Sequence, residues 1–169
     1  VNLDQIEILV GDISDPKSIQ RIASRTKVIM STAGPFAEIG TPIVDACVKS
    51  STNYVDITGE APWIREIIDK YHNSAAEKRI KIIPCCGFDC VPVDMGCRFL
   101  VDEMVKRGLS PQEVRMILTK TKGDASGGTI ASAFGVFAKT SLSSLFDLFN
   151  PFFLSPRDAT GVFDQPGPS

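Results

Sequence analysis

The stretch that decides the fold class is KIIPCCGFDCVPVDMGC, residues 81–97. An apolar run leads into a turn at Gly87, and Pro92 opens a segment whose apolar residues have helical spacing. This order predicts a buried strand at 81–87, then a loop, then a helix over 92–107 that Gly108 ends. Glycine in such a loop also allows the main chain to come close to a ligand.

The same order of strand and helix occurs three more times on the N-terminal side of this stretch. Short connections between strands and helices favour a parallel sheet with helices on both of its faces. The predicted fold class is therefore α/β with a Rossmann-type parallel sheet. The remaining strands are expected at residues 6–12, 27–36 and 54–60, and the remaining helices at 14–26, from Thr41 onward, and at 62–79.

The alternation stops after Gly108, so we expect a domain boundary there. EVRMILTKT, residues 113–121, predicts one strand, and a long amphipathic segment follows a Gly- and Ser-rich stretch. Residues 109–169 are then the beginning of a second, α+β domain for substrate binding or dimerisation. The chain begins without Met and with a strand, which suggests that residues 1–108 form an N-terminally incomplete domain.

Composition and charge exclude several classes of protein. The chain has 169 residues, 43% of them hydrophobic and 22% charged, which is typical of globular proteins. A net charge of -2 gives no reason to expect a nucleic acid as a partner. Five cysteines without a Cys-x-x-Cys pair, and one histidine, do not favour a zinc site. Reduced thiols and the lack of a visible secretory signal predict an intracellular protein.

Four unusual sequences fall where the predicted strands end: Gly11-Asp12, Ala33-Gly34-Pro35, Thr58-Gly59-Glu60 and Gly87-Phe88-Asp89. In an open parallel sheet, ligands bind at this edge, and the helix N-termini that follow can donate N–H groups to phosphate oxygens. The alternative is that these glycines only make turns. No G-x-G-x-x-G follows a first strand, so either the sheet binds no nucleotide or its first strand precedes Val1.

Four motifs in this order resemble those of the saccharopine dehydrogenase-like oxidoreductases. They are STAGPF at 31–36, YVDITGE at 54–60, PCCGFDCVPVDMG at 84–96 and KGDASGGTIAS at 122–132. The resemblance is loosest after about residue 141. Cys90 departs from it, since the family pattern has serine at that position, and any role of a hydroxyl there is lost.

The resemblance implies an NAD- or NADP-binding Rossmann domain over 1–108 that transfers hydride to or from a small-molecule substrate. Asp12 and Ile13 would lie beside the adenine. A second group would border the pyrophosphate and the nicotinamide ribose, and a third would face the cleft between the domains. The second group is Thr32, Ala33, Gly34, Pro35 and Phe36, and the third is Gly59, Glu60, Gly87, Phe88 and Asp89.

Asp89 is the candidate catalytic residue, because a carboxylate there could bind a substrate amine or orient a water molecule. The alternative is that it caps the following helix. Asp56 and Glu60 could do acid–base work if burial raised one pKa, although a surface Glu60 capping the next helix is the simpler interpretation. A thiol nucleophile at Cys85, Cys86 or Cys90 is less expected, because no histidine lies close to these cysteines in sequence.

Aromatic and aliphatic residues within 129–154 leave two interpretations open. The stripe could pack in a core or a homodimer, or it could dock on a lipid or membrane surface. The second interpretation, which the family resemblance also allows, is a non-catalytic protein associated with lipid droplets or membranes. A different Rossmann-type dehydrogenase is a third possibility.

Overall fold

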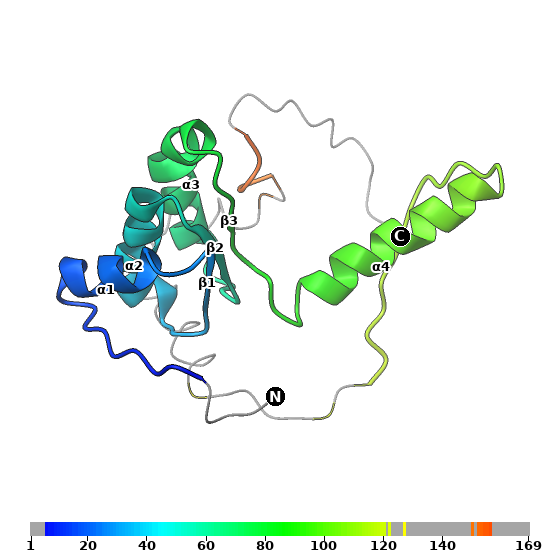
Figure 1. Ribbon diagram of the computed structural model, residues 1–169. Helices are drawn as coiled ribbons and strands as arrows, with labels where there is room; N and C mark the ends of the chain where they lie inside the picture. Colours follow the sequence, from blue (N-terminus) through cyan, green and yellow to red (C-terminus); the bar gives the residue numbers. More distant parts are fainter. Residues whose placement is uncertain (1–5, 121, 123–126, 128–149, 151, 157–169) are drawn as a thin grey trace.

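The computed structural model describes residues 6–120, 122, 127, 150 and 152–156. The described chain is α/β, with three short parallel strands alternating with four helices (Figure 1). This confirms the predicted fold class and is consistent with part of a Rossmann-like sheet. The strands are β1 (Val28–Ser31), β2 (Asn53–Asp56) and β3 (Ile82–Ile83); the helices are α1 (Pro16–Ala23), α2 (Phe36–Ser50), α3 (Ala61–Glu77) and α4 (Val91–Lys106).

The strands lie in the order β1-β2-β3 and all run in the same direction. Ser31 pairs with Asp56, and Val55 pairs with Ile83. Since parallel strands place their carboxyl ends at the same edge, the loops after the three strands meet there. We call these loops, residues 32–35, 57–60 and 84–90, the carboxyl edge.

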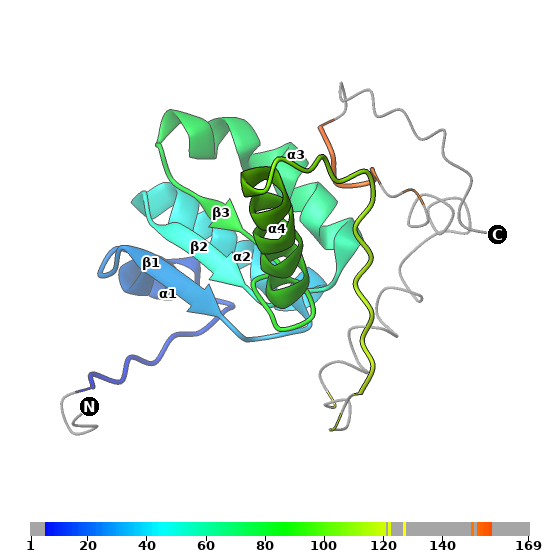
Figure 2. The same cartoon turned by 90° about the vertical axis from the view of Figure 1, so that its right-hand side faces the viewer.

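Helices α2 and α3 cover one face of the sheet, and α1 packs against α2 (Figure 2). The core on this side is built around Tyr54 of β2, Val44 of α2 and Trp63 of α3, each at most 2% exposed. The opposite face is open: Val28, Met30 and Ile83 are 48%, 72% and 47% exposed. Helices on both faces were expected, whereas the described residues cover only one.

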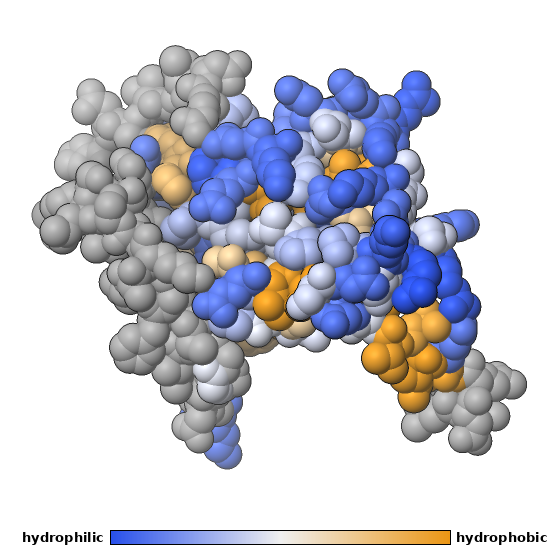
Figure 3. All heavy atoms as spheres, turned by 90° about the vertical axis from the view of Figure 1, so that its left-hand side faces the viewer, coloured by the Kyte–Doolittle hydropathy of each residue, from blue (hydrophilic) through white to orange (hydrophobic). Residues whose placement is uncertain are grey.

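Two predicted strands are absent from the described residues. Residues 6–12 have no regular structure, and Ile8 and Val10 are 86% and 90% exposed. Figure 3 shows this segment as an apolar patch beside the grey N-terminal residues. Residues 113–120 also form no strand. A strand needs a neighbour for its N–H and C=O groups, and no described strand pairs with either segment.

The helices follow the sequence pattern more closely, with one large difference. α3 and α4 begin and end within two residues of the predicted bounds, and Gly108 ends α4 with a left-handed φ of 72°. α2, in contrast, begins at Phe36, five residues before Thr41, and contains Pro42 in its interior. α4 extends away from the sheet and buries none of its residues (Figure 1). The domain boundary near residue 108 stays a prediction.

Candidate functional site at the carboxyl edge

The three glycines of the carboxyl edge leave main chain accessible after each strand. Gly34 and Gly59 are exposed and Gly87 is partly exposed. A Cβ atom at Gly59 would meet no atom closer than Asp89 Oδ2, at 4.0 Å. Thr32 and Ala33 are exposed as well, and Phe88 is 81% exposed. The carboxyl edge is therefore a shelf, by which we mean a surface of exposed backbone against which a flat molecule can lie.

Asp89 lies across this shelf. A Cβ atom at Gly87 would sit 2.8 Å from Asp89 Oδ1, so the carboxylate lies directly beside the Gly87 backbone. The side chain is exposed, and Cys90, not Asp89, is the N-cap residue of α4, with no side-chain cap bond. The helix-cap interpretation of Asp89 is therefore wrong, and its carboxylate faces the shelf.

Glu60 is buried and ties two loops of the edge together. Its Oε1 and Oε2 atoms accept hydrogen bonds of 2.8 Å from the backbone N–H groups of Phe36 and Ala37, the first two residues of α2. At 3% exposure it is not the surface residue expected, and it makes no side-chain cap on α3. Its carboxylate occupies the positive end of α2, where an anion is most favourable.

The start of α2 therefore offers no free donors to a phosphate. Pro35 O accepts from the next two N–H groups, of Glu38 and Ile39. The Phe36 ring is buried against Trp63, with 5.7 Å between centroids. The prediction that the helix after β1 presents free N–H groups to phosphate oxygens is wrong, because the chain supplies its own carboxylate.

A second buried carboxyl group lies beneath the edge. Asp56 is fully buried, and its Oδ1 accepts from the N–H groups of Thr58 and Cys85, at 3.0 and 3.1 Å. It thus joins the loops after β2 and β3. Asp56 Oδ2, Tyr54 Oη and Ser31 Oγ are enclosed and have no hydrogen-bond partner among the described residues.

Burial raises the pKa of Asp56 above its ordinary value of 3.8, because water no longer solvates the charged form. The nearby charge of Glu60 acts in the same direction. Burial also raises the pKa of Tyr54, and the neighbouring Asp56 adds to this. Acid–base work by Asp56 and Glu60 required that burial raise the pKa of one of them, and burial raises that of Asp56. Both carboxyl groups, however, accept hydrogen bonds from the backbone of this protein.

Asp12 and Ile13 do not follow a strand. Asp12 is exposed beside the turn that precedes α1, where its Oδ1 accepts from the Ser14 N–H at 2.8 Å. Ile13 packs against the small core of Ile19, Ala23 and Ala46. A role beside an adenine, which the resemblance implied, stays a prediction for both.

Sequence reasoning did not find the buried cluster of Ser31, Tyr54 and Asp56. A signal was present, because Tyr54 and Asp56 alternate along one strand and so point to the same face. What the sequence lacked was the register that sets Ser31 opposite Asp56.

The residues of the edge fit one part of a dinucleotide better than another. Exposed glycine main chain and the free face of Asp89 suit a flat ring and hydroxyl groups, which donate to carboxylates. The three carboxyl groups and the occupied N-terminus of α2 do not suit a pyrophosphate. The open backbone and the Asp89 carboxylate therefore suit a flat group with hydroxyls better than an anion, and the N-terminus of α2 has no free N–H group for a phosphate.

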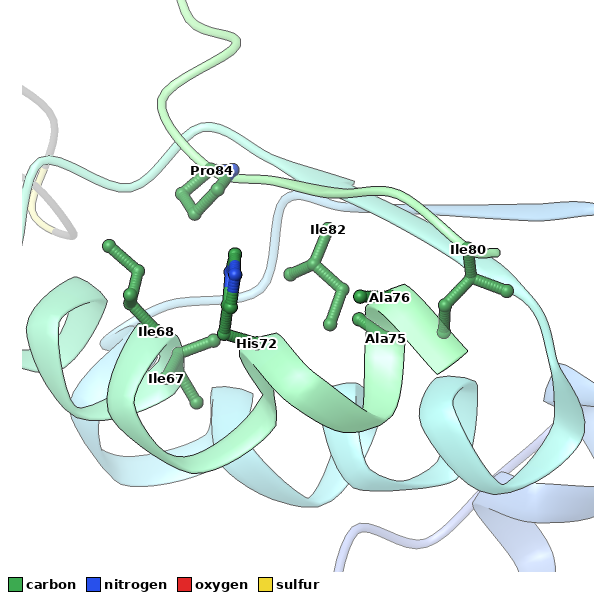
Figure 4. A pocket seen from close by; sticks show the side chains of 8 residues that line it. All are labelled: Ile67, Ile68, His72, Ala75, Ala76, Ile80, Ile82 and Pro84. Carbon is green, nitrogen blue, oxygen red and sulfur yellow. The ribbon is translucent and has the colours of Figure 1, made fainter. Parts of the chain in front are cut away.

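A separate cavity of about 250 Å³ lies between α3 and β3 (Figure 4). Isoleucine and alanine side chains line it, with His72 directed toward Pro84. His72 is the only histidine in the chain, and it has no acidic or thiol neighbour in this lining. We therefore do not include the cavity in the candidate site.

The curated relatives of this chain share one activity in their names. The chain is 37% identical over 152 residues to a protein of Mycobacterium tuberculosis (strain ATCC 25618 / H37Rv) named "Putative trans-acting enoyl reductase". Proteins of Mycobacterium ulcerans and Mycobacterium bovis, each named "Trans-acting enoyl reductase", are 36% and 35% identical over 127 residues. These matches cover 88%, 74% and 74% of the chain. No protein-family model and no solved structure matches it.

The chain spans about a third of the length of the curated relatives it matches, 36% of the first and 30% of the other two. These relatives also correct the resemblance drawn from the four motifs. They are named as enoyl reductases, not as saccharopine dehydrogenase-like proteins. Short glycine-containing motifs at strand ends recur among nucleotide-binding sheets, so they identify a type of edge better than a family.

Association with lipid droplets or membranes finds no support in the relatives. Most of the stripe within 129–154 lies outside the described residues. None of the helices in the described part of the chain combines the length and the hydrophobicity needed to cross a bilayer.

Proposed function

We propose that this chain forms part of a nicotinamide-dependent enoyl reductase, and that its carboxyl edge holds the nicotinamide end of NADH or NADPH. The observation that carries the proposal is the gathering of three glycine-containing loops at one edge of a parallel sheet, with Asp89 across them. The names of the relatives support the type of reaction.

The substrate class follows from the same proposal. An enoyl group is a carbon–carbon double bond conjugated to a carbonyl, and its reduction needs a hydride at the far carbon and a proton at the carbon beside the carbonyl. NAD(P)H, when bound, supplies the hydride. The electron pair of the double bond moves toward the carbonyl, and the proton completes the saturated acyl product.

The residues of this chain would position the reactants. Backbone at Gly34, Gly59 and Gly87 allows close approach to the ring, and the Asp89 carboxylate accepts hydrogen bonds from ribose hydroxyls or from the carboxamide. Glu60 and Asp56 keep the three loops at fixed spacing from beneath.

The experiment uses the complete protein that contains this sequence, with an enoyl thioester and NADH or NADPH. We expect loss of the reduced cofactor to match formation of the saturated thioester, mole for mole. If the complete protein binds neither cofactor, the proposal is wrong. If it binds one of them but reduces no enoyl thioester, the cofactor part stands and the substrate class falls.

A further inference from the structure

The cavity between α3 and β3, which the carboxyl edge does not include, has an almost wholly apolar lining (Figure 4). Its volume is about 250 Å³. Seven of its eight lining residues are isoleucine, alanine or proline, and the eighth is His72. A closed cavity of about 150 Å³ with similar walls binds benzene. The cavity therefore has room for an apolar group larger than benzene.

The cavity is elongated along β3. Its wall on the side of the sheet consists of Ile80, Ile82 and Pro84, which alternate along the chain and so face the same side. At a rise of about 3.3 Å per residue, Ile80 and Pro84 are about 13 Å apart. The other wall is α3, with Ile68 near the Pro84 end and Ala75 near the Ile80 end (Figure 4). A long, narrow space of this kind fits a chain better than a ring system.

The chemistry of the lining distinguishes an alkyl chain from a peptide. His72 is the only lining residue with a polar side chain. A peptide segment in this space would leave backbone N–H and C=O groups without partners, and each unpaired group costs free energy. An alkyl chain has no such groups, and its burial against isoleucine and alanine side chains is favourable. The cavity therefore suits an alkyl chain better than a segment of protein.

Pro84 joins this cavity to the carboxyl edge. It lines the cavity and is also the first residue of the loop 84–90. His72 is directed toward Pro84 (Figure 4), so the one polar side chain of the lining points to the end of the cavity nearest the edge. A molecule that reacts at the edge can therefore place an apolar tail along β3.

We propose that the cavity between α3 and β3 binds the alkyl tail of the enoyl substrate, whose double bond lies at the carboxyl edge. The inference rests on the proposed function for the identity of the substrate, and on the lining and position of the cavity for the place of its tail. Substrates with a tail long enough to pass Pro84 are bound more tightly than substrates without one. Each further methylene group in the cavity should tighten binding about three- to fourfold.

The first test compares crotonyl and decenoyl thioesters as substrates of the complete protein that contains this sequence. Ala76 lines the cavity and is exposed, so Ala76→Phe places a ring there without disturbing the core. We expect the ratio of kcat/KM for the decenoyl thioester to that for the crotonyl thioester to fall about tenfold, since about two methylene groups lose their contacts. Asn73→Phe adds the same ring on the exposed side of α3, outside the lining, and should leave the ratio unchanged. Thermal unfolding checks that both variants are folded.

A second measurement needs neither a variant nor turnover. A saturated decanoyl thioester with a photoreactive diazirine at the end of its tail is bound to the complete protein and irradiated, and mass spectrometry locates the labelled peptides. We expect labels on α3 between residues 67 and 76 and on the chain between residues 80 and 84. An excess of the decanoyl thioester without the diazirine should suppress this labelling.

The two measurements separate the inference from the proposed function. If labels appear only in other parts of the protein, or if the ratio in Ala76→Phe equals that in Asn73→Phe, the assignment of the cavity is wrong, even where both thioesters are reduced. If α3 and residues 80–84 are labelled in a protein that reduces neither thioester, the cavity assignment stands and the proposed reaction falls.

Discussion

Glu60 Oε1 accepts a hydrogen bond of 2.8 Å from the backbone N–H of Phe36, 24 residues earlier in the chain. The buried carboxylate of Glu60, the last residue of the loop after β2, thereby binds the first turn of α2. The relationship explains two features together, the early beginning of α2 and the absence of free donors at its N-terminus.

Replacing Glu60 tests this link. Glu60→Ala should lower the free energy of unfolding by about 1–3 kcal/mol, because two buried N–H groups lose their acceptor. Glu60→Gln keeps one acceptor oxygen and should cost less. Urea unfolding measures the difference, with Glu66→Ala on the exposed side of α3 as control. Equal stability of Glu60→Ala and the control would contradict the role given to Glu60.

The raised pKa of Asp56 predicts a specific dependence of stability on pH. The folded protein holds the Asp56 proton at pH values where the unfolded chain, with a pKa near 3.8, has released it. Stability therefore decreases as the pH rises from about 3.8 through the folded pKa. Asp56→Asn cannot titrate, so its stability relative to the parent should rise over this interval and then level off.

Chemical unfolding of the parent and of Asp56→Asn at several pH values measures this difference. Its pH trend is the test, since a constant offset could arise from the changed hydrogen bonds alone. A relative stability of Asp56→Asn that falls with pH would show a depressed pKa and contradict the assignment.

Gly40 packs against Trp63 so closely that a Cβ atom would lie 2.6 Å from the indole ring. Gly40→Ala should therefore destabilise the protein by about 1–3 kcal/mol through overpacking, although alanine favours helices. Gly59→Ala, whose Cβ atom has open space, serves as the comparison in thermal unfolding. A stabilised Gly40→Ala variant would mean that Trp63 does not pack against α2 in this way.

Asp89 should matter to the proposed reaction more than to stability. In the complete protein, we expect Asp89→Asn to lower kcat/KM with an enoyl thioester about 10- to 100-fold, by weakening the hold on the cofactor. Asp94→Asn, in the first turn of α4, should change it little. Steady-state kinetics on both variants make the comparison. Equal losses in the two would remove Asp89 from the site.

The sequence predicted the parts of the fold that depend on local pattern. The spacing of apolar residues located α3 and α4, and Gly108 marked the end of α4. The beginning of α2 could not be predicted from the local sequence. The backbone N–H groups of its first two residues, Phe36 and Ala37, donate to the carboxylate of Glu60, which lies far along the chain. Residues 6–12 have a strand-like composition but, in the described residues, no partner strand.

The sequence predicted where the candidate site lies, but not which of its carboxyl groups are buried and which are exposed. Glycines after four apolar runs predicted four loops at one edge. The register confirms three of them, whereas Gly11-Asp12 follows no strand in the described residues. That Glu60 and Asp56 are turned inward, while Asp89 faces outward, depends on contacts between loops far apart in sequence. Those contacts leave the start of α2 without a free N–H group for a phosphate.

Hydrogen–deuterium exchange on the complete protein, with and without NADPH or NADH, tests the central claim most directly. The account predicts slower exchange on cofactor binding in the three loops of the carboxyl edge, residues 32–35, 57–60 and 84–90, with little change in the last turn of α3. Cofactor binding that leaves these loops unchanged and protects only other parts of the protein would contradict it.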